Sequence, residues 1–362
     1  MRTVFAALLE NRLNLLLVAA PASWALEAMA PGSAWIFLMS AISLVPLAGL
    51  IGFGTEQLAG RAGPVWGGFL NATFGNAAEL IIAIVALHDG HVELVKASIT
   101  GSILGNLLLV LGLSCFVGGL GRRSQTFNRT AASNTTVMLF LAVVALVMPA
   151  VFDLTLFGSL KPRPPAIDRL SLWSSVILIV AYGGSLIYAF TSQRDLFRET
   201  SSEGRSEPRM SARAATGVLA ASTVLVAVQS EVLVGALQPA LGQFGFTELF
   251  VGVIVIAIVG NAAEHYSAVT AARRNEMTLS VEIAVGSSAQ IALLVAPLIV
   301  LYLFVSGQPM SLLFNALEIT AIGLSVVATA LVAADGESNW VEGLQLMAVY
   351  LILALAFYLV PA

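Results

Sequence analysis

The sequence predicts an all-α integral membrane protein of about eleven transmembrane helices, arranged as one N-terminal helix and two inverted five-helix repeats. Three observations predict this fold. Hydrophobic residues make up 58% of the 362 residues and only 10% are charged, whereas soluble proteins carry about 25% charged residues. The apolar stretches are long enough for membrane-crossing helices of ~20 residues. A five-residue motif also occurs twice, and no ~10-residue alternation typical of a membrane β-barrel is present.

Apolar runs between polar connections define the expected spans. These lie near residues 13–30, 34–58, 64–87, 94–118, 131–152, 168–190, 214–240, 247–271, 278–305, 311–333 and 340–360. The first run could instead be a signal peptide, because Arg2 and Arg12 precede an apolar stretch that ends in small residues. Glu27 within this run and Pro31 after it favour a retained helix.

The basic residues predict the orientation. With these spans, thirteen of the 17 Lys and Arg residues lie on the side of the N-terminus, and four lie on the other side: Lys96, Lys161, Arg163 and Arg169. Cytoplasmic loops are enriched in Lys and Arg, so we expect a cytoplasmic N-terminus and an external C-terminus. The short termini favour a prokaryotic inner membrane.

The expected organisation has four parts: an N-terminal helix (1–32), a first repeat (33–190), a cytoplasmic linker (191–213) and a second repeat (214–362). The linker mixes acids and arginines and is typical of a solvated connector. A formal charge of −4 without a basic block gives no support for nucleic-acid binding. A single cysteine, Cys115, excludes an intrachain disulfide and a cysteine-based metal site.

The two repeats are defined by a motif and its spacing. Gly75-Asn76-Ala77-Ala78-Glu79 recurs in the second half as Gly260-Asn261-Ala262-Ala263-Glu264. The same spacing relates Gly101-Ser102 to Gly286-Ser287. Each unit holds five spans, an odd number, so the second enters the membrane from the opposite side. Inverted repeats of this kind are typical of secondary transporters, whose substrate site lies near the midplane between the repeats.

Two glutamates are the candidate ligands. Asn76 and Glu79 are three residues apart and share one helical face, as do Asn261 and Glu264. An ionised acid near the bilayer centre costs roughly 2.5–3.5 kcal/mol and requires a partner. Neutral oxygens on the following helices complete an all-oxygen set that suits Ca²⁺, from Ser102, Asn106, Ser287 and Gln290. The alternative, that both glutamates are protonated packing groups, is disfavoured by the matched pair.

Other polar residues receive weaker interpretations. Glu56 and Glu231 correspond only if a gap of about ten residues is allowed between the repeats. His265 follows Glu264 but points about 100° around the helix, and a packing role is favoured over ligation. A solvated external turn is expected for His88, Asp89, His91 and Glu93.

At Gly-Asn-Ala-Ala-Glu in both halves, and from Gly260 to Gln290 especially, the sequence closely resembles the cation/proton exchanger family of Ca²⁺/H⁺ antiporters, within the Ca²⁺/cation antiporter superfamily. The resemblance covers nearly the whole chain. It implies that Glu79 and Glu264 bind Ca²⁺ and protons in turn, with Asn76, Asn261 and the Gly-Ser segments completing the site. It also implies that the membrane-embedded acids Glu56 and Glu231 line the approach path. The acidic helix of some eukaryotic members is absent, because 191–213 is mixed in charge.

The residues and the resemblance lead to one expected mechanism. Desolvation and mutual repulsion favour protonated carboxylates, so an empty occluded site takes up protons that Ca²⁺ must displace. With an inward proton gradient, the cell would export Ca²⁺. The transported Ca²⁺ and H⁺ are the only ligands implied, with no cofactor, and nothing indicates the oligomeric state.

Three alternatives stay open at this point. A Na⁺ or K⁺/H⁺ antiporter on the same scaffold is the nearest, because selectivity depends on cavity size. An intramembrane hydrolase is distant, since no His-Glu-x-x-His motif is present. A passive channel fits poorly, because paired buried carboxylates suit occlusion better than fast release.

Overall fold

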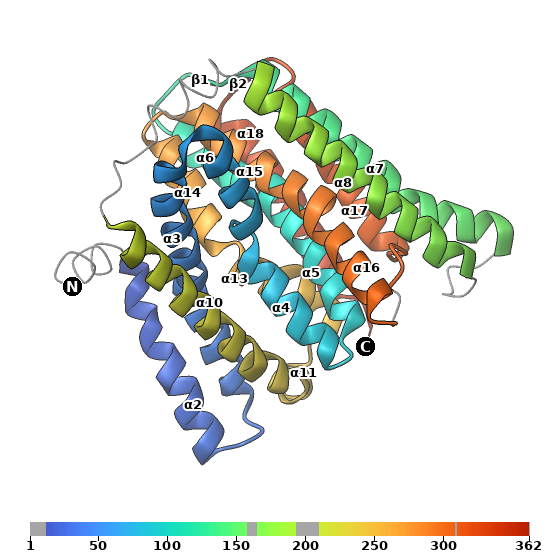
Figure 1. Ribbon diagram of the computed structural model, residues 1–362. Coiled ribbons are helices and arrows are strands. Elements are labelled where there is room, and N and C mark those ends of the chain that lie inside the picture. Colours follow the sequence, from blue (N-terminus) through green and yellow to red (C-terminus); the bar gives the residue numbers. More distant parts are fainter. Residues whose placement is uncertain (1–11, 158–164, 193–209, 308–309, 362) are drawn as a thin grey trace. The chain divides into compact units, whose positions relative to one another are not determined.

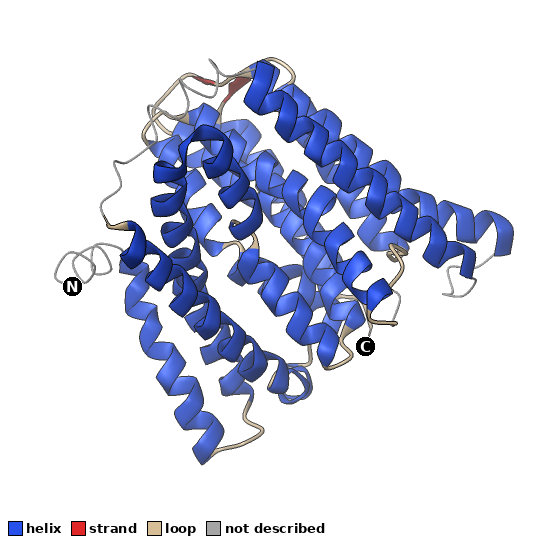
Figure 2. Cartoon of the chain, viewed as in Figure 1, coloured by secondary structure: helices blue, strands red, loops and turns tan. Residues whose placement is uncertain are grey.

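The computed structural model describes residues 12–157, 165–192, 210–307 and 310–361, and nearly all of them are helical (Figures 1 and 2). The first half contains η1 (Arg12–Val18), α2 (Ala19–Met29), α3 (Ala34–Phe74), α4 (Ala77–His88), α5 (Val92–Leu104), η2 (Gly105–Val110), α6 (Leu111–Gly119), β1 (Gln125–Thr126), α7 (Arg129–Phe157) and α8 (Pro165–Ser192). The second half contains α10 (Ala212–Gly235), α11 (Leu237–Phe244), α12 (Glu248–Phe250), η3 (Val251–Ile256), α13 (Ala257–Gly260), α14 (Ala262–Arg273), α15 (Met277–Gln290), η4 (Ile291–Val295), α16 (Ala296–Val305), α17 (Ala316–Ala333), β2 (Glu337–Ser338) and α18 (Trp340–Tyr358).

Eight helices of the described chain are long and apolar enough to cross a bilayer, and one bent pair, Leu237–Phe244 with Glu248–Gly260, makes a ninth if counted as one span. The eight correspond to eight of the expected spans, which confirms an all-helical membrane protein. Of the three other expected spans, 13–30 and 247–271 are assembled from shorter helices, and 64–87 consists of the end of α3 followed by α4. The count of eleven is therefore not reached by helix length alone.

The expected break between the spans 34–58 and 64–87 takes an unexpected form. Helix α3 continues through it for 41 residues. A Cβ atom added at Gly67 would lie only 2.7 Å from the carbonyl oxygen of Ala59, although residues eight apart in a straight helix are separated by about 12 Å. The chain therefore turns back sharply within α3, as the sequence predicts, and the part of α3 that is suited to cross a membrane ends at Ala62.

Chain contacts divide the protein into two compact units. The first unit comprises Met1–Ser98, Ser201–Ala263 and Phe357–Ala362, and the second comprises Ile99–Thr200 and Glu264–Ala356. In the first unit, α3 packs against α2 and α10, and α10 also packs against α4. In the second unit, α7 packs against α8, α15 and α17, and α8 packs against α16. Each unit therefore contains elements from both predicted repeats.

Strands β1 and β2 form a short antiparallel pair within the second unit. The sequence does not predict these strands. The two strands are red in Figure 2. Gln125 is paired with Ser338, and Thr126 with Glu337. The pair holds the connection between α6 and α7 beside the connection between α17 and α18. Its importance lies in Gln125, whose side chain is almost fully buried.

The backbone reproduces the repeat at the same spacing as the sequence. Helices α4 and α14 start and end at equivalent positions of the two repeats, and α5 and α15 start at equivalent positions. The turns between these helices contain Gly90 at φ 85° and Asn275 at φ 69°, which are also equivalent. Matching backbone hydrogen bonds occur, from His91 N to Ala86 O and from Glu276 N to Ala271 O. The duplication is thus present in the backbone structure as well as in the amino-acid sequence.

Candidate functional site

Each repeated motif breaks a helix at its asparagine. Asn76 has φ −104° and ψ 26° between α3 and α4, and Asn261 has φ −96° and ψ 11° between α13 and α14. The apolar runs predict continuous spans here, and the glycine before each asparagine is the signal in the sequence for a break. Interrupted helices at membrane depth are typical of transporter binding sites, where freed backbone groups face the substrate.

The breaks determine where the two glutamates lie. Glu79 is in the first turn of α4, and Glu264 is in the first turn of α14. The first turn of a helix carries N–H groups without intrahelical partners and the positive end of the helix dipole. Both carboxylates are therefore placed where a negative charge is stabilised, and both side chains are half-buried.

Within the first unit, the structure brings residues of the two motifs together. A Cβ atom at Gly260 would lie 3.2 Å from Cγ and 3.6 Å from Oε1 of Glu79. Glu79 therefore lies against the backbone of the second motif, and a larger residue than glycine at position 260 would crowd its side chain. Asn76 and Asn261 are both buried, and Asn261 donates a hydrogen bond from Nδ2 to the carbonyl oxygen of Ala257 at 3.0 Å.

Within the second unit, the predicted amide and hydroxyl groups meet. Asn106 Nδ2 donates a hydrogen bond to Ser287 Oγ at 3.1 Å, and both side chains are buried. Ser102 is buried one turn before Asn106, and Gln290 is half-buried one turn after Ser287. The structure thus joins one pair of the predicted oxygen ligands across the two repeats.

Both of these helices change geometry beside the predicted ligands. The π-helical segment η2 begins at Gly105, next to Asn106, and η4 begins at Ile291, directly after Gln290. A π-helical turn widens the backbone and is found frequently at functional sites. These segments, which the sequence does not predict, occupy nearly equivalent positions in the two repeats.

Glu56 and Glu231 differ from the motif glutamates in exposure. Each is exposed, and each follows a buried hydroxyl residue, Thr55 or Ser230, whose side chain donates to the carbonyl four residues earlier. An exposed acid within a membrane span requires contact with water or another polar group. This environment agrees with a place outside a central site, and a role for these acids in the access path stays a prediction.

No group of three or more His, Cys, Asp or Glu side chains in the described part of the chain is placed to hold a metal ion. A divalent cation at the motif glutamates would therefore take its remaining ligands from amide, hydroxyl, backbone and water oxygens. Ca²⁺ accepts such mixed oxygen sets, with about 6–8 ligands and irregular geometry.

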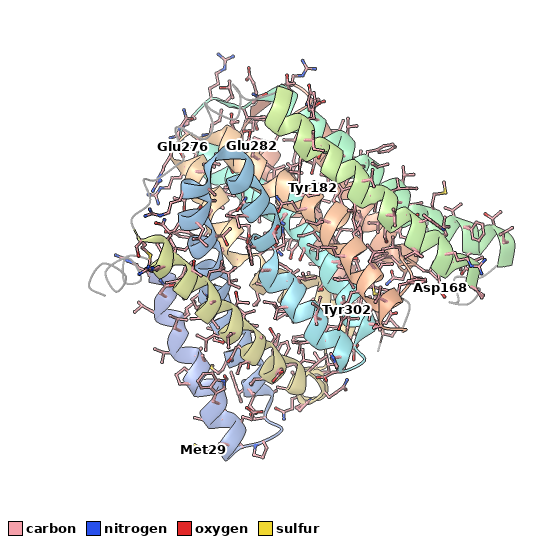
Figure 3. All side chains as sticks on the ribbon, viewed as in Figure 1. Met29, Asp168, Tyr182, Glu276, Glu282 and Tyr302 are labelled. Carbon is pink, nitrogen blue, oxygen red and sulfur yellow. The ribbon has the colours of Figure 1, made fainter. Side chains whose placement is uncertain are left out.

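Three further buried or half-buried acids were missed by the sequence analysis. Glu318 is buried at the start of α17 and accepts a hydrogen bond from Thr100 Oγ1 at 3.1 Å, one residue before the Gly101-Ser102 segment. Glu282 is half-buried on α15 (Figure 3). Asp153 is fully buried on α7. The signal that would have found them is an acid within an apolar span.

The histidines lie as follows. His265 is half-buried, and its Nε2 atom makes no hydrogen bond within the described residues. The expected solvated turn is correct for the exposed residues His88, Asp89 and Glu93 but wrong for His91. His91 is half-buried, and its Nδ1 atom lies 3.0 Å from Glu248 Oε1. A partner so distant in the sequence could not be inferred from local polarity.

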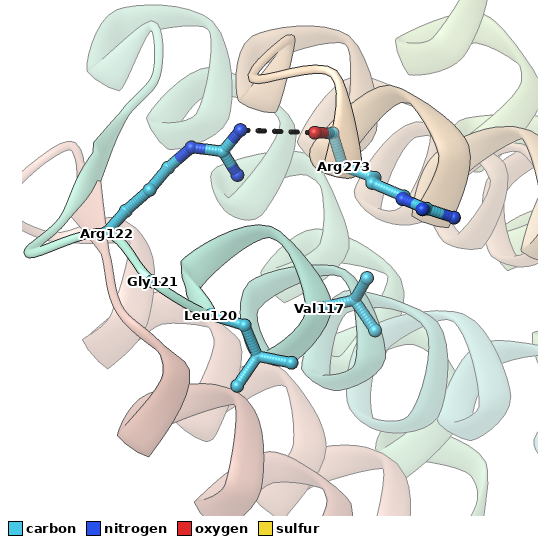
Figure 4. A pocket seen from close by; sticks show the side chains of 5 residues that line it. All are labelled: Val117, Leu120, Gly121, Arg122 and Arg273. Carbon is cyan, nitrogen blue, oxygen red and sulfur yellow. Dashed lines mark hydrogen bonds between the residues drawn. The ribbon is translucent and has the colours of Figure 1, made fainter.

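A cavity of about 580 Å³ lies elsewhere, lined by Val117, Leu120, Gly121, Arg122 and Arg273 (Figure 4). It includes none of the predicted site residues. Arg122 Nη2 donates to the carbonyl oxygen of Arg273 at 3.2 Å. The predicted orientation assigns both arginines to the N-terminal side of the membrane, and this contact supports that common assignment.

Comparison with known proteins places these features in a family. The family described as "Sodium/calcium exchanger protein" matches residues 32–191 and 214–359, which include both motifs and both Gly-Ser segments. The chain belongs to this family. It is therefore an integral membrane transporter of the Ca²⁺/cation antiporter superfamily and not an enzyme, as the resemblance implied.

Several named proteins resemble the chain over nearly its full length. A protein of Bacillus subtilis named "Ca(2+)/H(+) antiporter ChaA" is 43% identical, covering 96% of this chain and 99% of its own. A Synechocystis protein named "Ca(2+)/H(+) antiporter" is 41% identical, covering 96% of each chain. The solved structure entitled "Structure of native YfkE" shares 40% identity and a TM-score of 0.83, covering 97% of this chain and 100% of that one. The fold prediction is thereby confirmed.

Proposed function

We propose that this protein is a secondary active Ca²⁺/H⁺ antiporter that exports Ca²⁺ by alternating access, with Glu79 and Glu264 binding Ca²⁺ and protons in turn. Relatives about 40% identical over nearly the full chain are named Ca²⁺/H⁺ antiporters. The single observation that carries the residue assignment is the position of both glutamates in the first turns of helices broken at equivalent asparagines.

The exchange of Ca²⁺ for protons follows from the negative charge of the two glutamates. Two carboxylates held away from water favour protonation, because two bare negative charges are costly in an occluded site. A divalent cation compensates both charges at once and displaces their protons. The site is then stable when loaded with protons or with Ca²⁺, but not when empty, so the two ions cross in opposite directions.

The remaining ligands are neutral. Amide and hydroxyl oxygens of Asn76, Asn261, Ser102, Asn106, Ser287 and Gln290, together with backbone oxygens and water, complete the coordination in this proposal. Neutral oxygens bind a hard cation without adding charge that would also attract more protons. The contact between Asn106 and Ser287 supports this part of the proposal, because it joins polar groups that come from the two repeats.

The protein lies in a prokaryotic plasma membrane in this proposal, and its N-terminus is on the cytoplasmic side. The distribution of Lys and Arg supports this orientation, and the contact between Arg122 and the backbone of Arg273 agrees with a common side for these two arginines. The predicted linker lies largely outside the described residues, since only 191–192 and 210–213 of it are described.

A monovalent cation/H⁺ antiporter is the second candidate, supported by the sodium in the family description. Vesicles containing the purified protein and an imposed pH gradient distinguish the two. Ca²⁺ uptake, compared with Na⁺ and K⁺ uptake, should be driven by the gradient and abolished by Glu79→Gln or Glu264→Gln. The matched control is Glu27→Gln, which removes an exposed acid on α2 and should retain uptake. Gradient-driven uptake of Na⁺ or K⁺ without Ca²⁺ would establish the second candidate instead.

A further inference from the structure

Side chains from the connection after α6 form hydrogen bonds with the C-terminal end of α14, the helix that carries Glu264. Gln125 is only 2% exposed, and its Nε2 atom donates hydrogen bonds to Ala272 O at 3.0 Å and to Asn275 Oδ1 at 2.9 Å. Arg122, from the same connection, donates to Arg273 O (Figure 4). Two carbonyls of the last helical turn, Ala272 O and Arg273 O, thus accept hydrogen bonds from side chains of the other repeat, and Ala272 O also accepts one from the backbone N–H of Asn275.

Asn275 combines a left-handed backbone conformation with a side-chain acceptor. It is the only non-glycine residue with a positive φ among the described residues, and asparagine is one of the few residues besides glycine that adopts this left-handed conformation readily. Gly90 occupies the equivalent turn of the first repeat at φ 85°. Glycine therefore satisfies the backbone, and the asparagine adds only the Oδ1 acceptor that receives the Gln125 amide.

Gly118 completes the contact. A Cβ atom at this position would overlap Gln125 Oε1 and lie 3.0 Å from Ala272 O. The absence of a side chain on α6 therefore allows the buried Gln125 amide to reach the end of α14. Three positions, Gly118, Gln125 and Asn275, are each explained by the same contact.

The mechanical consequence concerns Glu264. Helix α14 has 12 residues, and the break at Asn261 separates it from α13. Because it is not a continuation of α13, its orientation depends on its other contacts, and the Gln125 contact is at its far end. Glu264 is nine residues from Arg273, about 13 Å along the axis of a rigid helix. A shift of the C-terminal end of α14 therefore also moves the carboxylate of Glu264.

We propose that Gln125 and Asn275 are positioning residues that hold α14 so that Glu264 is preorganised for its cation. The inference rests on the proposed function of Glu264. The equivalent turn of the first repeat lacks this device, because glycine stands at position 90 and the neighbouring His91 instead contacts Glu248. The contacts at the ends of the two motif helices thus differ in chemistry: a neutral amide contact after α14 and a histidine–glutamate contact after α4.

The test uses Asn275→Gly, Gln125→Ala and the double variant of the full chain in liposomes, with Ca²⁺ as the probe. Asn275→Gly preserves the backbone conformation and removes only the acceptor. Each single variant should weaken Ca²⁺ binding and raise the half-saturating Ca²⁺ concentration roughly fivefold, the equivalent of one hydrogen bond, with the maximal rate changed less than about twofold. The double variant should be no worse than the more affected single variant, because both remove the same contact.

The matched control is Gln243→Ala, which removes a glutamine that bonds backbone groups of Gly32 and Ala34, away from both motifs. It should leave Ca²⁺ affinity unchanged. Thermal unfolding without Ca²⁺ separates positioning from stability: affinity should fall in Asn275→Gly even where the midpoint is kept. Unchanged affinity in Asn275→Gly and Gln125→Ala, or additive losses in the double variant, would overturn the proposal. If instead Glu264→Gln binds Ca²⁺ like the wild type, the proposed function of Glu264 fails first.

Discussion

Asn106 and Ser287 are 181 residues apart in the sequence, and the side-chain amide of the first donates a 3.1 Å hydrogen bond to the hydroxyl of the second. Both side chains are buried within the second unit. Each belongs to a helix that changes to π-helical geometry within a few residues. The contact therefore joins equivalent regions of the two repeats at polar groups that have a proposed role in cation binding.

Ser287→Ala should weaken Ca²⁺ binding by roughly fivefold, because it removes one oxygen and leaves the Asn106 amide without this acceptor. Equilibrium Ca²⁺ titration of the purified protein measures the change. Ser325→Ala is the matched control, since Ser325 is also a buried hydroxyl and donates to Ile322 O on α17. Equal effects of the two substitutions would show that the loss is general to buried serines.

Gly260→Ala should impair Ca²⁺ transport, because the added methyl group would lie 3.2 Å from Glu79 Cγ and displace that side chain. We expect a loss of Ca²⁺ affinity of about tenfold, in the range for displaced, overpacked groups. Gly217→Ala is the control, because nothing lies within 4 Å of its added Cβ. Wild-type affinity in Gly260→Ala would contradict the close packing of Glu79 on the second motif.

Glu56→Gln and Glu231→Gln should slow transport more than they weaken equilibrium Ca²⁺ binding, because both acids are exposed rather than half-buried like Glu79 and Glu264. Initial uptake rates and equilibrium titrations on the same preparations separate the two effects. A loss of binding as complete as in Glu79→Gln would instead place these acids among the direct ligands.

Ca²⁺ affinity should fall as pH falls, because protons and Ca²⁺ compete for the same two carboxylates. The sign is fixed by the competition: acid protonates the glutamates and removes the charges that attract the cation. Calorimetry in buffers of different ionisation enthalpy should show protons released on Ca²⁺ binding, in steps that belong to the pair. Affinity that is constant between about pH 5 and pH 8 would indicate separate sites for the two ions.

Local properties of the sequence determined the class of the protein and the register of its duplication. Eight expected spans coincide with long apolar helices, because the length of an apolar run suffices to predict a membrane helix. The spacing between the two motifs, read from Gly75 to Glu79 and their counterparts, reappears in the bounds of α4 and α14. Equal sequences in equal environments fold alike, so this register needed no three-dimensional information.

Only the tertiary structure decided which residues meet. Three contacts join residues that are far apart in the chain. They are the close approach of Glu79 to Gly260, the hydrogen bond from Asn106 to Ser287 and the hydrogen bond from Gln125 to Ala272 O. Helical periodicity specifies which face a side chain occupies but not which neighbour that face contacts. His91 shows the same limit, since its partner Glu248 comes from a distant turn. Such contacts depend on how whole helices pack, which is a property of all their side chains together and not of any local pattern.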